Sequence, residues 1–166
     1  MKVSVITVTW NSVATLRDTL ESVLEQTYPD IEHILIDGNS IDGTMDLIQE
    51  YALRYKGRIR YISEPDNGIY DAMNKGIRMA SGEVVGILNS DDFYTAPDTV
   101  ERLMGELVSG GVDAVYGDIH FVDDKDLDKC VRYYSSASFK RWKMLLGFMP
   151  AHPSFYCRKQ VYERYG

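Results

Sequence analysis

Cysteine and histidine, which often build metal clusters and cross-links, are scarce in this 166-residue sequence. It contains two cysteines, Cys130 and Cys157, and three histidines, with no Cys/His spacing typical of a zinc site. No apolar run approaches the ~18 residues that a membrane-spanning helix needs. Because Met1 and Lys2 lead directly into an apolar segment, we expect no signal peptide and a reducing, cytoplasmic location.

Basic residues are also fewer than acidic ones, with 18 Lys or Arg against 25 Asp or Glu. The formal net charge of -7 argues against a nucleic-acid-binding protein, because such a protein needs a basic face. A ligand that carries phosphate must then be bound locally, by a metal ion or by backbone N–H groups. The motifs GxGxxG and GxxxxGKS/T are both absent, which excludes the dinucleotide fingerprint and the NTPase phosphate loop. A phosphoaspartate enzyme would need an acidic residue after the first strand, where Thr9-Trp10-Asn11 stands.

The sequence does contain a regular alternation of short apolar runs and helically spaced apolar residues. The expected strands cover residues 3–8, 31–36, 59–63, 84–88 and 114–122, and the expected helices cover residues 13–24, 45–55, 70–80 and 97–107. A charged turn at 123–129 with a partner strand at 131–134 predicts a late antiparallel hairpin, before a final strand at 152–157 and a helix from 160. The pattern predicts one α/β domain over residues 1–166, a mostly parallel sheet with helices on both faces.

The central apolar run, residues 84–88, leads straight into Asn89-Ser90-Asp91-Asp92. The carboxyl ends of parallel strands share one sheet edge, so Asp37, Asp66, Asp91 and Asp92 should gather there. Neighbouring carboxylates repel each other unless a cation lies between them, and hard oxygen ligands suit Mg²⁺ or Mn²⁺. The alternative is a solvated turn whose aspartates end the strand and cap the next helix.

These acceptors together fit a nucleoside diphosphate whose leaving charge is stabilised by a cation. Asp37 would accept a hydrogen bond from a base imide, and Asp91 or Asp92 would bind ribose while the other holds the metal. Simpler roles are available too: Asp37 and the Asp66-Asn67-Gly68 segment could only form turns, and Asn11 or Ser12 could cap the first helix. We expect structural roles for two further residues, both histidines within strands: His33 and His120.

Several ordered segments resemble the large family 2 of inverting nucleotide-sugar glycosyltransferases, which have the GT-A fold and often act in bacterial surface-glycan synthesis. The similar segments are Val-Ile-Thr-Val-Thr-Trp-Asn at 5–11, Ile-Asp-Gly-Asn-Ser-Ile-Asp-Gly-Thr at 36–44, Glu-Pro-Asp-Asn-Gly at 64–68, Asp-Ala-Met-Asn-Lys-Gly at 71–76, Ala-Ser-Gly-Glu at 80–83 and Leu-Asn-Ser-Asp-Asp at 88–92. Each segment is weak evidence alone, but the set in this order is highly specific.

The resemblance implies metal-dependent sugar transfer, with inversion, from a nucleoside-diphosphate sugar to a glycan or lipid-linked acceptor. A UDP-sugar is the expected donor, and Mn²⁺ or Mg²⁺ the expected cofactor. By this resemblance Asp91 and Asp92 bind the metal, and His152 lies near the diphosphate and the acceptor. The substrate-binding residues are then expected to be Thr7, Thr9, Asn11, Asp37, Asp66, Asn67 and Asp91.

Two departures from the family pattern matter. Asn89 stands where the family often has Asp, which leaves the metal-ligating carboxylate open between Asp91 and Asp92. The family's general base usually lies on an acidic motif that would fall beyond Gly166, so we expect a domain truncated at its C-terminal end, with His152 as a substitute base to test. A nucleotide-sugar-binding fragment without turnover is an alternative. A nucleotidyltransferase is a weaker one, because Lys2 and Arg17 are poorly placed for a phosphate-gripping loop.

One apolar segment late in the chain has two interpretations. We expect its side chains to pack on the sheet. The alternative is peripheral contact with the inner face of a membrane that holds a lipid-linked acceptor. The residues concerned are Trp142, Leu145, Leu146, Phe148 and Met149.

Overall fold

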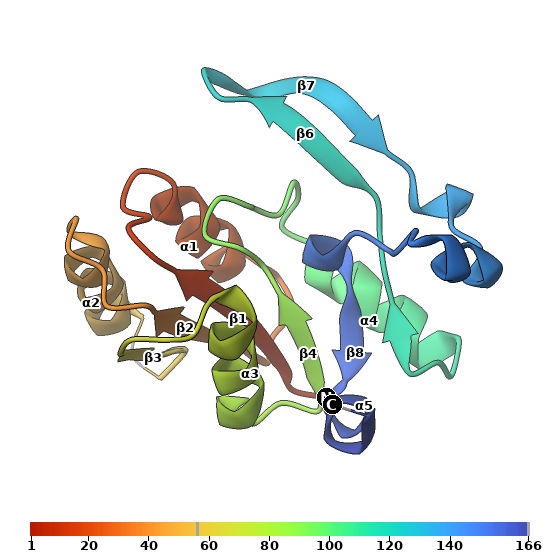
Figure 1. The fold of residues 1–166 in the computed structure, drawn as a ribbon, viewed down its shortest axis with the longest axis horizontal. Helices are drawn as coiled ribbons and strands as arrows, with labels where there is room; N and C mark the ends of the chain where they lie inside the picture. Colours follow the sequence, from red (N-terminus) through yellow and green to blue (C-terminus); the bar gives the residue numbers. More distant parts are fainter. Residues whose placement is uncertain (56, 166) are drawn as a thin grey trace.

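The computed structural model describes residues 1–55 and 57–165, and its centre is a six-stranded sheet with the order β3-β2-β1-β4-β8-β5 (Figure 1). The strands are β1 (Val3–Thr9), β2 (Ile31–Asp37), β3 (Ile59–Ser63), β4 (Val84–Ile87), β5 (Ala114–Val115) and β8 (Tyr156–Arg158). The first four pair in parallel, whereas β8 runs antiparallel to both of its neighbours. The mostly parallel α/β sheet predicted from the sequence is therefore confirmed.

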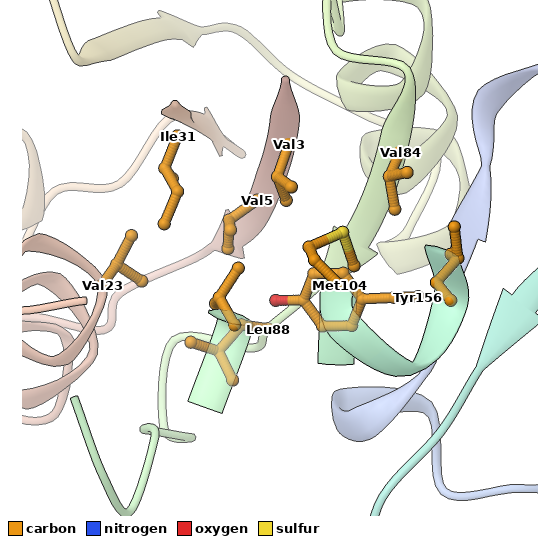
Figure 2. Close-up of a cluster of buried hydrophobic side chains, with 10 residues drawn as sticks. Val3, Val5, Val23, Ile31, Val84, Leu88, Met104 and Tyr156 are labelled. Atoms are coloured by element: carbon orange, nitrogen blue, oxygen red, sulfur yellow. The ribbon is translucent and has the colours of Figure 1, made fainter. Parts of the chain in front are cut away.

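Helices cover both faces of this sheet because its strands are apolar on both sides. They are α1 (Leu16–Leu24), α2 (Thr44–Arg54), α3 (Ile69–Met79), α4 (Thr99–Ser109) and α5 (Lys159–Tyr165). Val3 and Val5 of β1 contact the core that α1 and α4 complete, which Figure 2 shows around Val23 and Met104. The next residue, Ile6, faces the opposite way, into the core beneath α3.

Two glycines let elements approach closely enough to fix the sheet and its cover. A Cβ at Gly86 of β4 would lie 2.3 Å from the ring of Tyr156 in β8, so this ring occupies the space that a side chain would fill. A Cβ at Gly76 of α3 would lie 2.4 Å from Cγ2 of Ile6. These contacts place β8 and α3 directly against the strands whose ends form the site described below.

The prediction of one continuous strand at 114–122 is wrong, because this range contains two separate strands. Only β5 joins the main sheet, and the chain then leaves it to form β6 (Ile119–Asp123), which pairs with β7 (Asp126–Tyr134) in a separate two-stranded sheet. Hydrogen bonds to Gly117 and Asp118 interrupt the strand between β5 and β6. The Asp118 carboxylate accepts from the Ser136 N–H at 2.7 Å, and the Gly117 carbonyl accepts from the Ser154 hydroxyl at 2.9 Å. The predicted antiparallel hairpin is confirmed, but its turn is shorter than residues 123–129 because β7 already begins at Asp126.

The first helix begins at Leu16, three residues later than expected, and neither Asn11 nor Ser12 is its N-cap. The reason lies in the loop before α2. The Ser12 N–H donates to Thr44 Oγ1 at 2.8 Å, and the Val13 N–H donates to Asp42 Oδ2 at 3.1 Å. These bonds tie the start of the segment to a neighbouring loop and delay the first helical turn.

The segment between β7 and β8 contains three short 3₁₀ helices: η1 (Ser136–Ser138), η2 (Arg141–Leu146) and η3 (His152–Ser154). The expectation that its apolar residues pack on the sheet is wrong, because Trp142 is 61% exposed, Leu145 89% and Phe148 58%. The final strand is also shorter than expected, since His152 lies in η3 and only β8 pairs with the sheet. No helix within residues 1–55 and 57–165 has the length and apolar character needed to cross a membrane.

Candidate functional site

The carboxyl ends of β1, β2 and β3 meet in direct register. Thr9 pairs with Asp37, and Asp37 pairs with Ser63, so the last residues of three strands lie side by side. The loop after β4 lies alongside, because the Leu88 N–H donates to the Ile6 carbonyl of β1 at 2.9 Å. This edge of the sheet is where open α/β proteins bind ligands, and it carries most of the residues predicted for the site.

Asp37 is fully buried at the middle of this edge, and four donors surround its carboxylate. The Thr9 hydroxyl (3.0 Å) and the Ser40 hydroxyl (2.5 Å) donate to Oδ1, while the Ser40 N–H (3.0 Å) and the Ser63 hydroxyl (2.6 Å) donate to Oδ2. Burial acts to raise the pKa of Asp37, but the hydrogen bonds from Ser40, Ser63 and Thr9 outweigh it and lower that pKa.

The occupied carboxylate argues against the expected direct role of Asp37 in base recognition. A carboxylate offers about four lone-pair sites, and here each oxygen already accepts two hydrogen bonds. With its side chain enclosed, Asp37 has no acceptor left for a base imide. In this structure Asp37 joins the ends of β1, β2 and β3 and holds the loop at Ser40 through these hydrogen bonds.

Asn11 connects the loop after β1 to the loop after β2. Its N–H donates to the Ser40 hydroxyl at 2.8 Å, and its side-chain Oδ1 accepts from the Ile41 N–H at 3.0 Å. The residue has a φ of 51°, a left-handed conformation that asparagine tolerates better than most residues. The expectation of a helix cap is therefore replaced by a clamp between two loops at the site edge.

Thr7, another residue predicted to line the nucleotide pocket, lies inside the sheet. It has no exposed surface, and its hydroxyl is 2.9 Å from Nε2 of the buried His33. Burial lowers the pKa of His33 to about 3, with a smaller contribution from the charge of Arg58. Thr7 thus supports the edge from within, and the structural role expected for His33 is observed. The other histidine expected to be structural, His120, is on the exposed hairpin strand β6.

Asp66 and Asn67 lie in the turn between β3 and α3. Asp66 Oδ1 accepts from the Gly68 N–H at 2.8 Å, whereas Oδ2 lies 3.0 Å from the point where a Cβ on Gly38 would stand. The Trp10 ring is 3.3 Å from that same point, and this side chain is 71% exposed. Asp66, Gly38 and Trp10 therefore adjoin at the outer part of the edge, with one carboxylate oxygen free of the turn's hydrogen bond.

The second acidic group of the edge follows β4, where Asn89 joins two predicted site residues. Its side-chain amide nitrogen donates to Asp92 Oδ2 at 2.9 Å and lies 3.0 Å from Nε2 of His152, which comes from η3. The amide oxygen of Asn89 is buried and has no hydrogen-bond partner among the described residues. Asp91 is adjacent and exposed. The family resemblance predicted site roles for Asp91, Asp92 and His152, but it gave no sign of the Asn89 amide that contacts Asp92 and His152.

The charges around Asp92 favour a cation. Burial raises the pKa of Asp92, and the negative charge of Asp91 raises it further, while the Asn89 amide opposes both effects. A divalent ion would remove this repulsion, and carboxylate oxygens suit Mn²⁺ or Mg²⁺. Within residues 1–55 and 57–165, no three His, Cys, Asp or Glu side chains come together in a group able to hold a metal. A cation beside Asp92 would need its remaining ligands from a bound diphosphate or from water.

Sequence reasoning missed Asn89, Ser40 and Ser63. Asn89 stands where the family often has Asp, and its position before two aspartates gives no sign of a contact with His152. The position of Ser63 could have been used to predict its contact with Asp37. It is a polar residue at the end of a strand, and such a residue lies beside the last residue of the neighbouring parallel strand.

Comparison with known proteins agrees with this geometry. The family described as Glycosyl transferase family 2 matches residues 4–166. The chain belongs to glycosyl transferase family 2. This membership and the GT-A fold confirm the resemblance drawn from the sequence motifs.

Two curated mycobacterial family members illustrate the relationship. A PGL/p-HBAD biosynthesis glycosyltransferase of Mycobacterium tuberculosis is 37% identical over 119 residues, which cover 70% of this chain and 46% of that protein. An uncharacterized glycosyltransferase, Rv1514c, of the same species is 43% identical over 109 residues, covering 65% of this chain and 40% of that protein. The chain thus spans less than half the length of these relatives.

Solved structures share the fold over nearly the whole chain. The mannosyltransferase PcManGT from Pyrobaculum calidifontis, in complex with GDP-Man and Mn²⁺, has a TM-score of 0.76 and 22% identity over 99% of this chain and 46% of that chain. S. aureus TarS 1–349 in complex with UDP-GlcNAc has a TM-score of 0.79 and 20% identity, covering 99% of this chain and 47% of that chain. At these identities the likeness establishes the GT-A fold.

Proposed function

We propose that this chain binds a nucleoside-diphosphate sugar at the carboxyl edge of its sheet and supplies the donor site of an inverting glycosyltransferase. The acceptor would be a glycan or a lipid-linked sugar. The observation that carries the proposal is the convergence of Asp92 and His152 on one nitrogen of Asn89, beside Asp91 and at the ligand-binding edge of the fold. Family 2 membership and the nucleotide-sugar complexes of structural neighbours support it.

Asp92 is the proposed protein ligand of a Mn²⁺ or Mg²⁺ ion, with Asp91 directed to the ribose hydroxyls or to the same ion. When bound, the cation would offset the negative charge of the diphosphate as it leaves. The Mn²⁺ in the PcManGT complex supports this assignment. Asp92 is half-buried and its pKa is raised by burial and by the charge of Asp91, whereas Asp91 is exposed, which is why we assign the ion to Asp92 first.

The base of the nucleotide is proposed to lie near Trp10 and Asp66. The exposed indole offers a flat apolar face, and the free Oδ2 of Asp66 offers an acceptor for an imide N–H such as that of uracil. Gly38 leaves room beside both groups. Thr9, Asn11 and Asn67 then frame the nucleotide pocket, while Thr7 and Asp37 hold that frame in place from inside the sheet.

Inverting transfer also needs a base within hydrogen-bond reach of the acceptor hydroxyl. A carboxylate that holds a cation is a poor base, which removes Asp92 from consideration. Nε2 of His152 lies 3.0 Å from the amide nitrogen of Asn89, and an amide nitrogen can only donate, so this contact competes with the acceptor hydroxyl for Nε2. We therefore propose that residues 1–166 bind the donor well and transfer the sugar slowly.

Calorimetry of UDP binding tests the donor site directly. UDP should bind in the presence of Mn²⁺ and bind at least about tenfold more weakly with EDTA. Asp92→Asn should reduce the Mn²⁺-dependent affinity to a similar degree, whereas Asp124→Asn, an exposed carboxylate in the hairpin turn, should leave it unchanged. Equal UDP affinity with Mn²⁺ and with EDTA would overturn the metal assignment. Release of pyrophosphate from UTP would instead support nucleotidyl transfer.

A further inference from the structure

The late part of the chain has a charge distribution opposite to that of the whole protein. Residues 129–162 contain seven Lys or Arg residues and no Asp or Glu, although the complete sequence carries a net charge of -7. This stretch includes the last six residues of β7, the three 3₁₀ helices, β8 and the start of α5. Three of the seven are ion-paired: Lys129 with Asp123, Arg158 with Asp113 and Lys159 with Glu163. Three others, Lys140, Arg141 and Lys143, lie close together in the sequence, where they can attract an anionic partner.

The same part of the chain exposes large apolar side chains. We use the name apolar loop for residues 140–149, which include η2. Trp142 and Leu145 are three residues apart in this 3₁₀ helix, so their side chains share one face, and Phe148 follows with the same spacing. They are 61%, 89% and 58% exposed, respectively. Lys140 and Arg141 flank them and are also exposed.

Contacts to the rest of the protein hold the apolar loop in place at both ends. Asp118 accepts hydrogen bonds from the N–H and the hydroxyl of Ser136, both at 2.7 Å, just before the loop. Tyr134 of β7 donates to the Met149 carbonyl at 3.5 Å, and Ser154 is bonded to the Gly117 carbonyl at 2.9 Å just after it. The loop then leads directly to His152. In Figure 1 this segment follows β7 at the base of the projecting β6–β7 hairpin, to the right of β8.

We propose that the apolar loop is a docking surface for an anionic lipid bilayer. Exposed aromatic and aliphatic side chains flanked by Lys and Arg are the features that place a protein segment in a membrane interface. Each Lys or Arg near an anionic surface strengthens such binding by about fivefold. The proposal rests on the proposed function in one respect, since a lipid-linked acceptor in that bilayer would lie close to His152 and the donor site.

Charge argues against a second copy of the chain as the occupant of this surface. A twofold dimer presents the same patch from both partners, so the basic residues of one copy would face those of the other. An anionic bilayer instead pairs these charges while it covers Trp142, Leu145 and Phe148. The loop also lacks a helix long enough to span the membrane, so the contact would be peripheral.

Co-sedimentation with vesicles tests this proposal without nucleotide, so its result is independent of donor binding. The chain should bind vesicles of phosphatidylcholine mixed with phosphatidylglycerol at least about tenfold more tightly than vesicles of phosphatidylcholine alone. Leu145→Glu/Phe148→Glu should abolish binding, and Lys140→Gln/Arg141→Gln should weaken it about tenfold or more. Matched controls are Leu53→Glu/Val108→Glu and Arg78→Gln/Arg102→Gln, which change exposed residues on α2, α3 and α4 and should bind like wild type.

Each result has a defined meaning. Circular dichroism would first establish that all variants are folded. Equal binding to both vesicle types, or equal losses in the loop variants and their controls, would overturn the proposal. Self-association of the wild type that Leu145→Glu/Phe148→Glu removes, without any vesicle binding, would assign the surface to a second copy instead. UDP binding that persists while vesicle binding fails would reject the membrane contact and leave the donor site intact.

Discussion

The side-chain amide of Asn89 lies 3.0 Å from Nε2 of His152, although 63 residues separate them in the sequence. Asn89 comes at the end of β4 and His152 from the 3₁₀ helix before β8, so this contact connects the middle of the sheet to the late part of the chain. The same nitrogen donates to Asp92. An uncharged amide therefore fixes the orientation of both the proposed metal ligand and the nearby histidine.

Asn89→Ala should weaken Mn²⁺-dependent UDP binding by about 10- to 100-fold. Partners that orient a metal ligand typically contribute that much to metal affinity, and Asn89 is the hydrogen-bond donor that holds Asp92. Calorimetry with Mn²⁺ measures the effect. Asn74→Ala changes an exposed asparagine of α3 and serves as the control. If both variants bind UDP as the wild type does, the Asn89 contact has no part in donor binding.

Asp37→Ala should destabilise the fold by about 2–5 kcal/mol, because it removes the acceptor of four hydrogen bonds at a fully buried position. Unfolding in urea, followed by circular dichroism, gives the change in free energy. Asp124→Ala, in the exposed hairpin turn, should change stability by less than about 0.5 kcal/mol. If the Asp37→Ala protein is as stable as the wild type but fails to bind UDP, the structural role is contradicted and Asp37 has a direct role in base recognition.

The order of strands and helices, and the sheet edge where the acidic residues gather, followed from periodicity and parallel topology alone. The role of Asp37 did not, because it depends on neighbours that become visible only with the register. Once Thr9 and Ser63 flank Asp37 and the Ser40 loop folds back, no acceptor remains for a ligand. A sequence shows that an acidic residue lies at the edge, but not whether its lone pairs are already occupied.

The late part of the chain was harder to predict for a different reason. Apolar residues at 140–149 have the composition of core, yet the tertiary structure leaves them exposed. Likewise, the apolar run at 114–122 gave no sign of the break at Gly117 and Asp118, where hydrogen bonds from distant Ser154 and Ser136 interrupt pairing. Local pattern determines which segments are extended or helical, whereas long-range contacts determine which sheet an extended segment joins.

Two helical glycines should respond to alanine in opposite directions. Gly76→Ala places a Cβ 2.4 Å from Ile6 Cγ2 and should destabilise the protein by about 1–3 kcal/mol. Gly105→Ala, in α4, meets nothing within 4 Å and should stabilise it by about 0.5–1 kcal/mol, because alanine is the better helix former. Urea unfolding of both variants tests the pair. Stabilisation by Gly76→Ala would show that α3 does not depend on this close approach to β1.

Acid should destabilise the protein in two stages. His33 is buried with its pKa lowered to about 3, so the unfolded chain takes up a proton below its ordinary value of 6.5 while the folded chain does not. Stability should therefore fall as the pH decreases from 6.5, by at most about 1.4 kcal/mol per pH unit for this one proton. Glu32 adds to the loss below its ordinary pKa of 4.5, because its folded pKa is about 2. Burial alone would raise that pKa, but hydrogen bonds from Ser4 and Ser81 lower it.

The first stage can be assigned to His33 by measuring the free energy of unfolding in urea at several pH values between about 7 and about 5. This range spans the ordinary pKa of histidine, about 6.5. His33→Gln removes the buried titrating group, so its stability should be lower at neutral pH but nearly independent of pH across this window. His120→Gln changes an exposed histidine on β6 and should keep the wild-type slope. A slope that survives in His33→Gln and disappears in His120→Gln would place the acid sensitivity in the hairpin, because only the group that titrates differently in the folded and unfolded chains contributes to it.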